Sequence, residues 1–275
     1  MKEEIERATG RRVGAARPVG GGCINEGWRV ELEGGITAFV KTRRDVPPDE
    51  YENEAAALRW LAEPEAVNVP AVLGHSDRVL ALEWIDEGSL SADGAEALGG
   101  GLARMHAAGA EAFGGPNPLR IGRLEVPNEP LDDWPTFYAE RRLRPLLGAL
   151  DARGRDAVER VCERIHDLAG PPEPPARLHG DLWGGNVLAD KRGSGWLIDP
   201  IAYGGHREVD LAMLQLFGAP SQRILDAYRE EAPLADGYED RVGLWQLFPL
   251  LVHAALFGGH YAASAERTAR RYAGG

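Results

Sequence analysis

Hydrophobic and polar positions alternate over two runs near the start of the chain. In the first run, Trp28, Val30 and Leu32 alternate with charged residues, and the second run, 36–41, is mostly apolar. The glycine pair Gly34-Gly35 separates the two runs. A period of two interrupted by glycine is typical of a hairpin with one buried face.

Two more apolar runs, 69–74 and 79–85, predict further extended segments. Between these runs and the hairpin we expect a helix from about residue 50 to 62, which Asp49 can cap. Residues 1–85 are therefore predicted to form a small antiparallel sheet lobe with one inserted helix.

The pattern changes to helical spacing from residue 86 onward. Leu98, Leu102 and Met105 recur at intervals of three or four residues, which indicates an amphipathic helix. The expected helices lie at 95–108, 138–150, 156–169 and 208–217, and from Ser221 and Leu244 onward. We therefore predict an α+β fold with two lobes, in which a larger, mainly helical lobe, 86–275, follows the sheet lobe.

The 275 residues include 31 Lys plus Arg and 43 Asp plus Glu, which gives a formal net charge of −12. A field of this sign repels phosphate backbones and anionic lipid headgroups, so we expect neither nucleic acid nor a membrane as a partner. The longest apolar stretch, 244–257, is too short for a bilayer and predicts a buried helix.

The two cysteines, Cys23 and Cys162, are too few for a disulfide framework. The first residues are acidic, and we expect no secretory signal there. Both observations favour a cytoplasmic protein. Cys23 directly follows a glycine triplet whose N–H groups can lower a thiol pKa, so a redox-sensitive role is a hypothesis for it.

The segment from residue 179 to 199 places three oxygen-bearing side chains in the order that phosphoryl transfer requires. Asp181 can accept a proton from an attacking alcohol, while Asn186 and Asp199 offer oxygens to a metal ion. A predicted hairpin with its turn at 191–195 brings Asn186 and Asp199 together. Each residue alone is compatible with a turn or a cap, but their combination favours kinase-like chemistry.

Lys41 ends the returning strand of the first hairpin, where a lysine can reach nucleotide phosphates. Glu54, on the predicted helix, is the expected ion-pair partner, and Glu52 is the competing candidate. Leu58 favours Glu54, because it gives that residue an inward-facing neighbour one helical turn later.

Gly20, Gly21 and Gly22 precede the hairpin and can bring backbone N–H groups close to phosphate oxygens. A glycine triplet is more often a plain turn. Glu83 and Ile85 lie where the sheet gives way to helices, and their backbone groups are candidates for contacting an adenine edge. An ordinary edge strand is the alternative there, because backbone contacts leave no trace in the sequence.

Two further residues are expected to support the segment around Asp181. His179 is predicted to hold it through hydrogen bonds to the backbone, and Asp210 to cap a helix and brace the loop around His179. The histidines that lack metal-ligand spacing, and are expected in the core or at the surface, are His106, His166, His253 and His260.

The chain resembles the fructosamine kinase (ketosamine 3-kinase) family, a branch of the aminoglycoside-phosphotransferase-like and choline-kinase-like group. The stretches that carry the resemblance are Gly20-Gly21-Gly22-Cys23-Ile24, Phe39-Val40-Lys41, Glu52-Asn53-Glu54, 179–186, Ile198-Asp199-Pro200, 207–213 and 256–261. The glycine turn and the loop at 181–186 are more specific to this family than the other motifs. His206 departs from the pattern, since the family often has an acidic residue there.

The resemblance implies a protein-kinase-like fold that binds ATP and Mg²⁺ between its lobes. The family phosphorylates the 3-hydroxyl of a sugar joined to an amine through a ketoamine linkage, and the unstable product then releases the sugar. The implied roles are a base for Asp181, magnesium binding for Asn186 and Asp199, phosphate placement for Lys41 and Glu54, and a wall of the sugar site for Trp183. The preferred amine or sugar, free or protein-bound substrate, and the oligomeric state are left open.

Asp210 follows Pro200 by only ten positions. This interval leaves no room for a peptide-docking platform, so a small alcohol is the expected acceptor. Gly180 fits the same view, because protein kinases regulated by phosphorylation usually place an arginine at that position.

Two alternatives compete with a ketosamine kinase. A kinase for another alcohol, of aminoglycoside, choline or thiosugar type, would use clustered carboxylates, for which the candidates are Asp132, Asp133, Glu140 and Glu230. The second alternative is a nucleotide-binding scaffold without turnover, which has no need for the complete set of catalytic residues.

Overall fold

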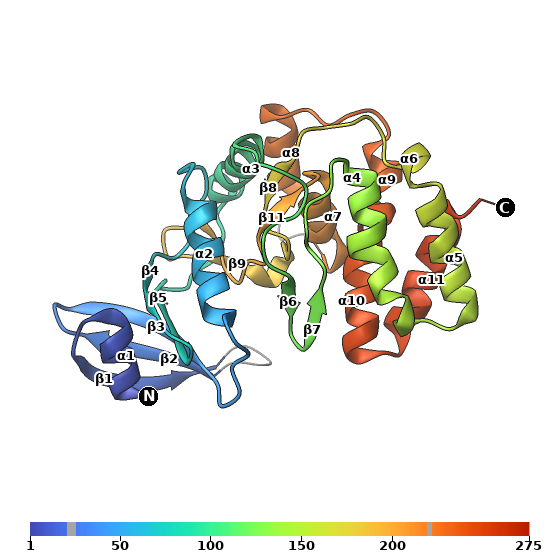
Figure 1. Cartoon of the computed structure of the whole chain (residues 1–275). Helices are drawn as coiled ribbons and strands as arrows, with labels where there is room; N and C mark the ends of the chain where they lie inside the picture. Colours follow the sequence, from blue (N-terminus) through green and yellow to red (C-terminus); the bar gives the residue numbers. More distant parts are fainter. Residues whose placement is uncertain (21–25, 219–221, 275) are drawn as a thin grey trace.

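The computed structural model describes residues 1–20, 26–218 and 222–274. The main sheet lies at one end of the molecule with helices α1 (Lys2–Thr9) and α2 (Glu50–Ala62), and the other end is helical (Figure 1). This arrangement confirms the predicted α+β fold, with a small antiparallel sheet and a larger helical region.

The strands of this sheet follow the order β1-β2-β3-β5-β4 within the described residues, and all neighbours are antiparallel. Their bounds are Val13–Val19 (β1), Glu26–Leu32 (β2), Ile36–Thr42 (β3), Val72–His75 (β4) and Val79–Glu83 (β5). The predicted hairpin is confirmed as β2 and β3, with Leu32 opposite Ile36. Strand β1 escapes sequence prediction because it contains Pro18, which an edge strand tolerates but a central strand does not.

Helices α1 and α2 pack on opposite faces of the sheet. Ile5 of α1 belongs to a core cluster with Val40, whereas Leu58 of α2 belongs to another cluster with Leu80. Lys41 pairs with Leu80 in the ladder and follows Val40, so it points to the face that α2 covers. The alternation of side chains along β3 therefore directs Lys41 toward α2.

The predicted helix at 50–62 is confirmed as α2 with Asp49 at its N-cap position, but the side chain of Asp49 does not make the cap. Asp49 occupies the N-cap position with a φ of 61°, and its side chain accepts no backbone N–H. N-cap residues that do accept one are usually extended, and the left-handed backbone of Asp49 directs its carboxylate elsewhere.

Most helical segments lie close to where the sequence predicts them, with two exceptions. The bounds are Ala92–Ala107 (α3), Trp134–Phe137 (α4), Ala152–Glu163 (α5), Ile165–Leu168 (α6), Glu208–Leu216 (α7), Gln222–Glu231 (α8), Tyr238–Trp245 (α9), Leu247–Phe257 (α10) and His260–Tyr272 (α11). The helix predicted at 156–169 is divided into α5 and α6 at Arg164. The helix predicted at 138–150 is a π-helical segment, Tyr138–Leu143, followed by a 3₁₀ segment, Arg144–Ala149. Pro145 explains the break, because it has no N–H to donate to an α-helical partner.

The apolar stretch at 244–257 is divided between α9 and α10, and most of α10 is buried. Of the helices in the described ranges, none combines the length and the apolar character needed to cross a bilayer. The predicted buried helix is therefore confirmed.

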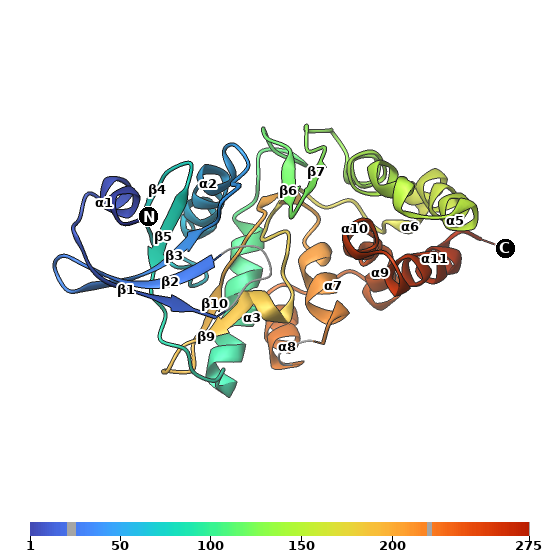
Figure 2. The ribbon, with the colours of Figure 1, turned by 90° about the horizontal axis from the view of Figure 1, so that it is seen from below.

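Short antiparallel ribbons connect the two regions. They are β6 (Leu119–Ile121) with β7 (Leu124–Val126), β8 (Ala176–Leu178) with β11 (Tyr203–Gly205), and β9 (Val187–Ala189) with β10 (Gly195–Leu197). The pair β9 and β10 confirms the second predicted hairpin, and Figure 2 shows it between the main sheet and α7. The segment 179–186 therefore lies between β8 and β9, at the junction of the two regions.

Candidate active site

Lys41 lies between two carboxylates from different parts of the chain. Its Nζ is 2.6 Å from Oε1 of Glu54 and 2.5 Å from Oδ1 of Asp199. Burial lowers the pKa of Lys41, but the two carboxylates outweigh burial, and the net shift is upward. Lys41 is therefore a fixed ammonium group, and the expected ion pair with Glu54, not Glu52, is present.

The loop before Asp181 is held by a buried carboxylate. Asp210 accepts hydrogen bonds from the backbone N–H groups of His179, at 2.7 Å, and Gly180, at 2.9 Å. His106 contacts the same carboxylate, and its other ring nitrogen lies 2.8 Å from the hydroxyl of Tyr228. The expected brace around His179 is thus present.

The predicted helix cap at Asp210 is wrong. Helix α7 begins at Glu208 after Arg207, so Asp210 lies inside the first turn, fully buried. Its carboxylate reaches the loop because His179 and Gly180 pack directly against the first turn of α7. His179 behaves as predicted, since its Nε2 lies 2.9 Å from the carbonyl oxygen of Ile198.

Asp181 and Asn186 contact each other across the turn that joins them. The side-chain Nδ2 of Asn186 donates to the backbone carbonyl of Asp181 at 2.8 Å and to its Oδ2 at 3.0 Å. Burial raises the pKa of Asp181 to about 6, although the bond from Asn186 lowers it, while Asp199 and Asp210 raise it further. An aspartate with such a pKa is a better proton acceptor near neutral pH than an ordinary one.

Two residues have backbone conformations that fix the site. Asp199 has a φ of 56°, an unusual value for a residue with a side chain, and this value orients its carboxylate toward Lys41. Gly180 has a φ of 84°, and a Cβ at this position would lie 2.6 Å from the carbonyl oxygen of Ile201. Glycine is therefore required beside Asp181 for packing reasons.

We call the group of Lys41, Glu54, Asp181 and Asp199 the cleft cluster. All of its members line one cavity of about 1120 Å³, whose other walls come from α2 and residues 108–122. The cluster contains three carboxyl groups and one ammonium group, so its charge is unbalanced toward negative. Such an imbalance suits a divalent cation.

The oxygen donors of the site suit a hard divalent cation such as magnesium. Asn186 uses its amide nitrogen toward Asp181, which leaves the carbonyl end of the amide for a cation, and Asp199 is about half exposed. Across the described ranges, no group of three or more His, Cys, Asp or Glu side chains could hold a metal alone. Magnesium is commonly held by one or two protein oxygens together with nucleotide phosphates and water, so such a group is not needed.

The remaining predicted site residues are not members of the cleft cluster. Gly20 follows β1 and is exposed, whereas Gly21, Gly22 and Cys23 lie outside the described residues. Glu83 ends β5, and its N–H donates to the carbonyl of Ala71 at 2.8 Å.

The carboxylate of Glu83 also accepts a hydrogen bond, from the N–H of Ala71 at 3.2 Å. Ile85 follows two residues later, where the chain leaves the sheet. Glu83, Ile85 and Trp183 are not among the described residues that line the cavity beside α2. The residues predicted to contact adenine and sugar therefore lie outside this cavity lining.

Trp183 is exposed, and its indole lies edge-on to Phe217, with 6.0 Å between ring centroids. Rings from the C-terminal helices continue this contact, including His253, which was expected to be a core or surface residue. Sequence reasoning missed Phe217 and these rings as a group. The only available signal was the spacing of His253, Phe257 and Tyr261 at four-residue intervals.

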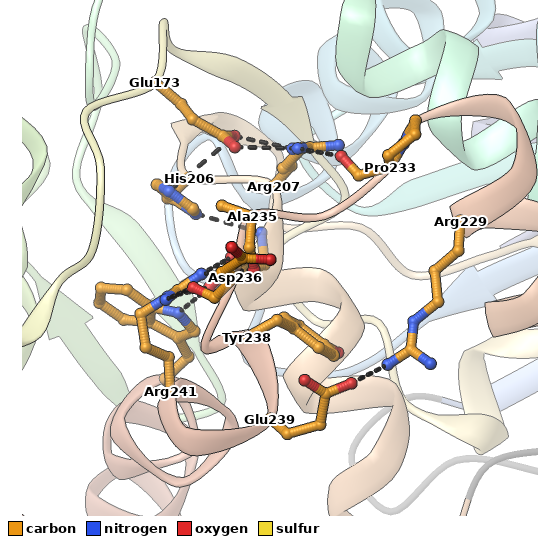
Figure 3. A network of polar contacts seen from close by, with 12 residues as sticks. Glu173, His206, Arg207, Arg229, Pro233, Ala235, Asp236, Tyr238, Glu239 and Arg241 are labelled. Atoms are coloured by element: carbon orange, nitrogen blue, oxygen red, sulfur yellow. Dashed lines mark hydrogen bonds and ion pairs between the residues drawn. The ribbon is translucent and has the colours of Figure 1, made fainter.

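A second charged group, drawn in Figure 3, lies around the start of α7, and none of its residues is among the described residues that line the cavity. We call Glu173, His206, Arg207, Glu208 and Arg241 the α7 network. Arg241 donates to both carboxylate oxygens of Glu208, at 2.9 and 2.6 Å, and Arg207 donates to both oxygens of Glu173, at 2.7 and 2.9 Å. His206 lies 3.9 Å from Glu173, so the departure noted in the sequence occurs within a structural network.

The comparison with known families decides which family this chain belongs to. The family model described as fructosamine kinase matches residues 1–273. The chain belongs to the fructosamine kinase family. A protein of Synechocystis sp. named as a ketoamine kinase is 34% identical, with 97% of this chain and 94% of that protein covered.

Other relatives agree with this assignment. The chloroplastic protein-ribulosamine 3-kinase of Arabidopsis thaliana is 35% identical, and the alignment covers 90% of this chain and 79% of that protein. A crystal structure from Thermobifida fusca, named as a fructosamine-3-kinase, has a TM-score of 0.93 at 45% identity and covers 99% of this chain and 98% of that one.

The wider kinase-like fold is shared by more distant proteins. The choline kinase LicA of Streptococcus pneumoniae has a TM-score of 0.65 at 14% identity, with coverage of 99% of this chain and 96% of that chain. This likeness concerns the fold alone. The chain is a kinase of the fructosamine kinase family with a protein-kinase-like fold.

Proposed function

We propose that this kinase transfers the γ-phosphoryl group of ATP to the 3-hydroxyl of a ketoamine-linked sugar and thereby promotes deglycation. The observation that carries the proposal is the meeting of Lys41, Glu54 and Asp199 beside Asp181 in one cavity. The family names of the relatives supply the substrate class.

In the proposed mechanism, Asp181 accepts the hydrogen bond of the sugar hydroxyl and orients that oxygen for in-line attack. Its carboxylate is held by Asn186, and its backbone is held through the contacts of Asp210 with the preceding residues. The raised pKa of Asp181 suits it to take the proton that the alcohol loses.

Lys41 would bind nucleotide phosphates, and Glu54 would keep it in place. Asn186 and Asp199 would hold Mg²⁺, which when bound supplies positive charge to the phosphates. Gly20 with Gly21 and Gly22 is proposed as the phosphate turn. Because the N–H of Glu83 is occupied by Ala71, we assign the adenine contacts to the carbonyl of Glu83 and the backbone of Ile85.

Trp183 is proposed to form one wall of the sugar site. We also propose that residues 1–85 and 86–275 act as two lobes that enclose the nucleotide. A cytoplasmic location without nucleic-acid or membrane partners is proposed from the charge and the scarcity of cysteine.

The carboxylates considered for a cationic aminoglycoside or choline are partly used elsewhere. Asp133 accepts the N–H of Thr136 as the cap of α4, and Glu140 pairs with Arg144. Because Asp133 and Glu140 already have these partners, they do not favour an aminoglycoside or choline as the acceptor.

The proposal is tested by incubating the protein with ATP, Mg²⁺ and fructosyl-lysine, and following ADP release and the ³¹P spectrum of the product. We expect a phosphate ester on C3 that then decays with release of the free amine. Choline and an aminoglycoside serve as competing acceptors. Turnover on either of these in place of the ketoamine would contradict the proposal.

A further inference from the structure

The large hydrophobic side chains that are exposed are unevenly distributed. Among the described residues they are Met1, Trp183, Phe217 and Phe257. Three of them belong to a continuous line of rings that begins in the loop of Asp181. Contiguous exposed aromatic surface beside a reaction centre indicates a binding surface.

We call Trp183, Phe217, His253, Phe257 and Tyr261 the aromatic row. Centroids of contacting rings lie 6.0 Å apart for Trp183 and Phe217, 5.0 Å for Phe217 and His253, 5.7 Å for His253 and Phe257, and 4.9 Å for His253 and Tyr261. The row therefore runs from the catalytic loop onto α10 and α11.

Both ends of the row are fixed. At one end, the backbone N–H of Trp183 donates to the backbone carbonyl of Asp181 at 3.1 Å. The indole of Trp183 packs on Gly185, where an added Cβ would lie 2.3 Å from the ring. At the other end, Arg123 donates to the carbonyls of Ala255 and Leu256, at 3.1 and 2.7 Å. The backbone that carries the row is therefore held near Trp183 and near Phe257.

We propose that the aromatic row binds the protonated amine and the aliphatic stem of the acceptor, on the side of the ketoamine away from the reacting hydroxyl. The inference rests on the proposed function. It identifies the group joined to the sugar, which we call the carrier, as an alkylammonium group such as a lysine side chain. It also assigns Phe217 and Phe257 as residues that determine which carrier is preferred.

The chemistry of the row matches an alkylammonium carrier better than a second sugar. Sugar hydroxyls need several polar partners, whereas the row presents mainly ring carbon, and Nδ1 of His253 already donates to the carbonyl of Pro249 at 2.8 Å. Ring faces attract cations, and apolar ring surface favours contact with methylene groups. The net charge of −12 adds a long-range preference for a cationic carrier.

The test compares two acceptors that share the fructosyl sugar and the secondary ammonium but differ in stem length, fructosyl-hexylamine and fructosyl-methylamine. The wild type is expected to have the higher kcat/KM for the hexyl acceptor. Phe217→Ala and Phe257→Ala are each expected to reduce this preference about three- to tenfold, mainly through KM for the hexyl acceptor.

Two variants serve as controls. Phe257→Tyr keeps a ring and is expected to keep the preference, and His166→Ala removes an exposed ring of α6 that lies outside the row. Phe257 is 68% exposed, so its loss is not expected to impair folding.

A preference unchanged in both alanine variants, or a wild type that uses both acceptors equally, would overturn the inference while leaving the proposed function standing. No turnover of either acceptor by the wild type would instead overturn the proposed function. Gel filtration of the alanine variants completes the test. A smaller oligomer than the wild type would show that the row joins two copies, which also overturns the inference.

Discussion

The cleft cluster and the α7 network are both built from carboxylates and cations, but they differ in charge balance and exposure. In the cleft cluster, one lysine and three carboxyl groups line the same cavity, Lys41 pairs with Glu54 and Asp199, and Asp199 remains about half exposed. In the α7 network, Arg241 and Arg207 each pair with one glutamate through two hydrogen bonds, and Glu208 is fully buried. The cleft cluster therefore has uncompensated negative charge that a cationic ligand can neutralise, whereas the charges of the α7 network neutralise one another.

This difference teaches how to separate a reactive site from a structural one when both are rich in charge. A balanced and buried group stabilises the fold only if it stays complete. An unbalanced group that lines a cavity costs stability, and its surplus charge is offset when a cation or substrate binds. The comparison therefore predicts activity losses from one cluster and stability losses from the other.

The largest expected effect comes from Asp181→Asn. This change keeps the shape of the side chain but removes the proton acceptor, so kcat is expected to fall about 10²- to 10⁴-fold. Nucleotide affinity, measured by calorimetric titration with ADP and Mg²⁺, is expected to remain near that of the wild type. A kcat close to the wild-type value would show that the cleft cluster does not contain the base.

The next effect, in the α7 network, is on stability. Arg241→Met leaves the carboxylate of Glu208 buried with Trp245 as its remaining side-chain partner, and the free energy of unfolding is expected to fall by about 3 kcal/mol or more. Urea denaturation measures this change.

The matched control for Arg241→Met is Arg229→Met. Arg229 pairs with Glu239 at 2.8 Å in an exposed position (Figure 3). Its loss is expected to cost about 1 kcal/mol or less. Equal losses for the two variants would mean that burial does not distinguish the α7 network.

Gly180→Ala is expected to affect both activity and stability, because this glycine precedes Asp181 and donates its N–H to the buried carboxylate of Asp210. The positive φ and the 2.6 Å approach of Ile201 predict a loss of about 1–3 kcal/mol in unfolding free energy, together with a lower kcat. Gly148→Ala is the control, since a Cβ there meets nothing within 4 Å. If the two variants were equally stable and active, the loop would not depend on this glycine.

The smallest expected effect concerns pH and the α7 network. Burial lowers the pKa of His206 below its usual value, although Glu208 and Glu173 oppose this shift. The unfolded chain therefore takes up a proton on His206 at a higher pH than the folded chain does. The contribution of neutral His206 to stability is present above about pH 6.5 and declines as the pH falls below that value.

His206→Gln tests this contribution, because glutamine stays neutral at every pH in question. We expect the difference in unfolding free energy between wild type and variant to shift in favour of the variant between pH 7.5 and 5.5. Urea denaturation at several pH values measures it. A difference that stays constant over this range would contradict the assignment.

Sequence reasoning succeeded where the relevant partners follow a local period. The position of Leu58 one helical turn after Glu54 favoured Glu54 over Glu52 as the partner of Lys41, and the structure has this ion pair. The turn after Asn186 likewise identified the hairpin that brings Asp199 back. These predictions depend on periods of two and 3.6, which the sequence displays directly.

Other features depend on contacts that leave no periodic trace. Glu208 and Arg241 are far apart in the chain and meet only because α7 and α9 pack together. Pro145 divides a helix into π and 3₁₀ segments, and Pro18 disguises an edge strand. The aromatic row combines a loop residue with two helices, so its residues were visible but their common surface was not.

The most direct test of the charge-imbalance account is a crystal structure of the protein with Mn²⁺ in place of Mg²⁺ and a non-hydrolysable ATP analogue. We expect an anomalous peak bound by oxygens of Asn186 and Asp199, with Lys41 on the phosphates and no metal at the α7 network. A metal bound elsewhere, with Asn186 and Asp199 turned away from it, would contradict the account.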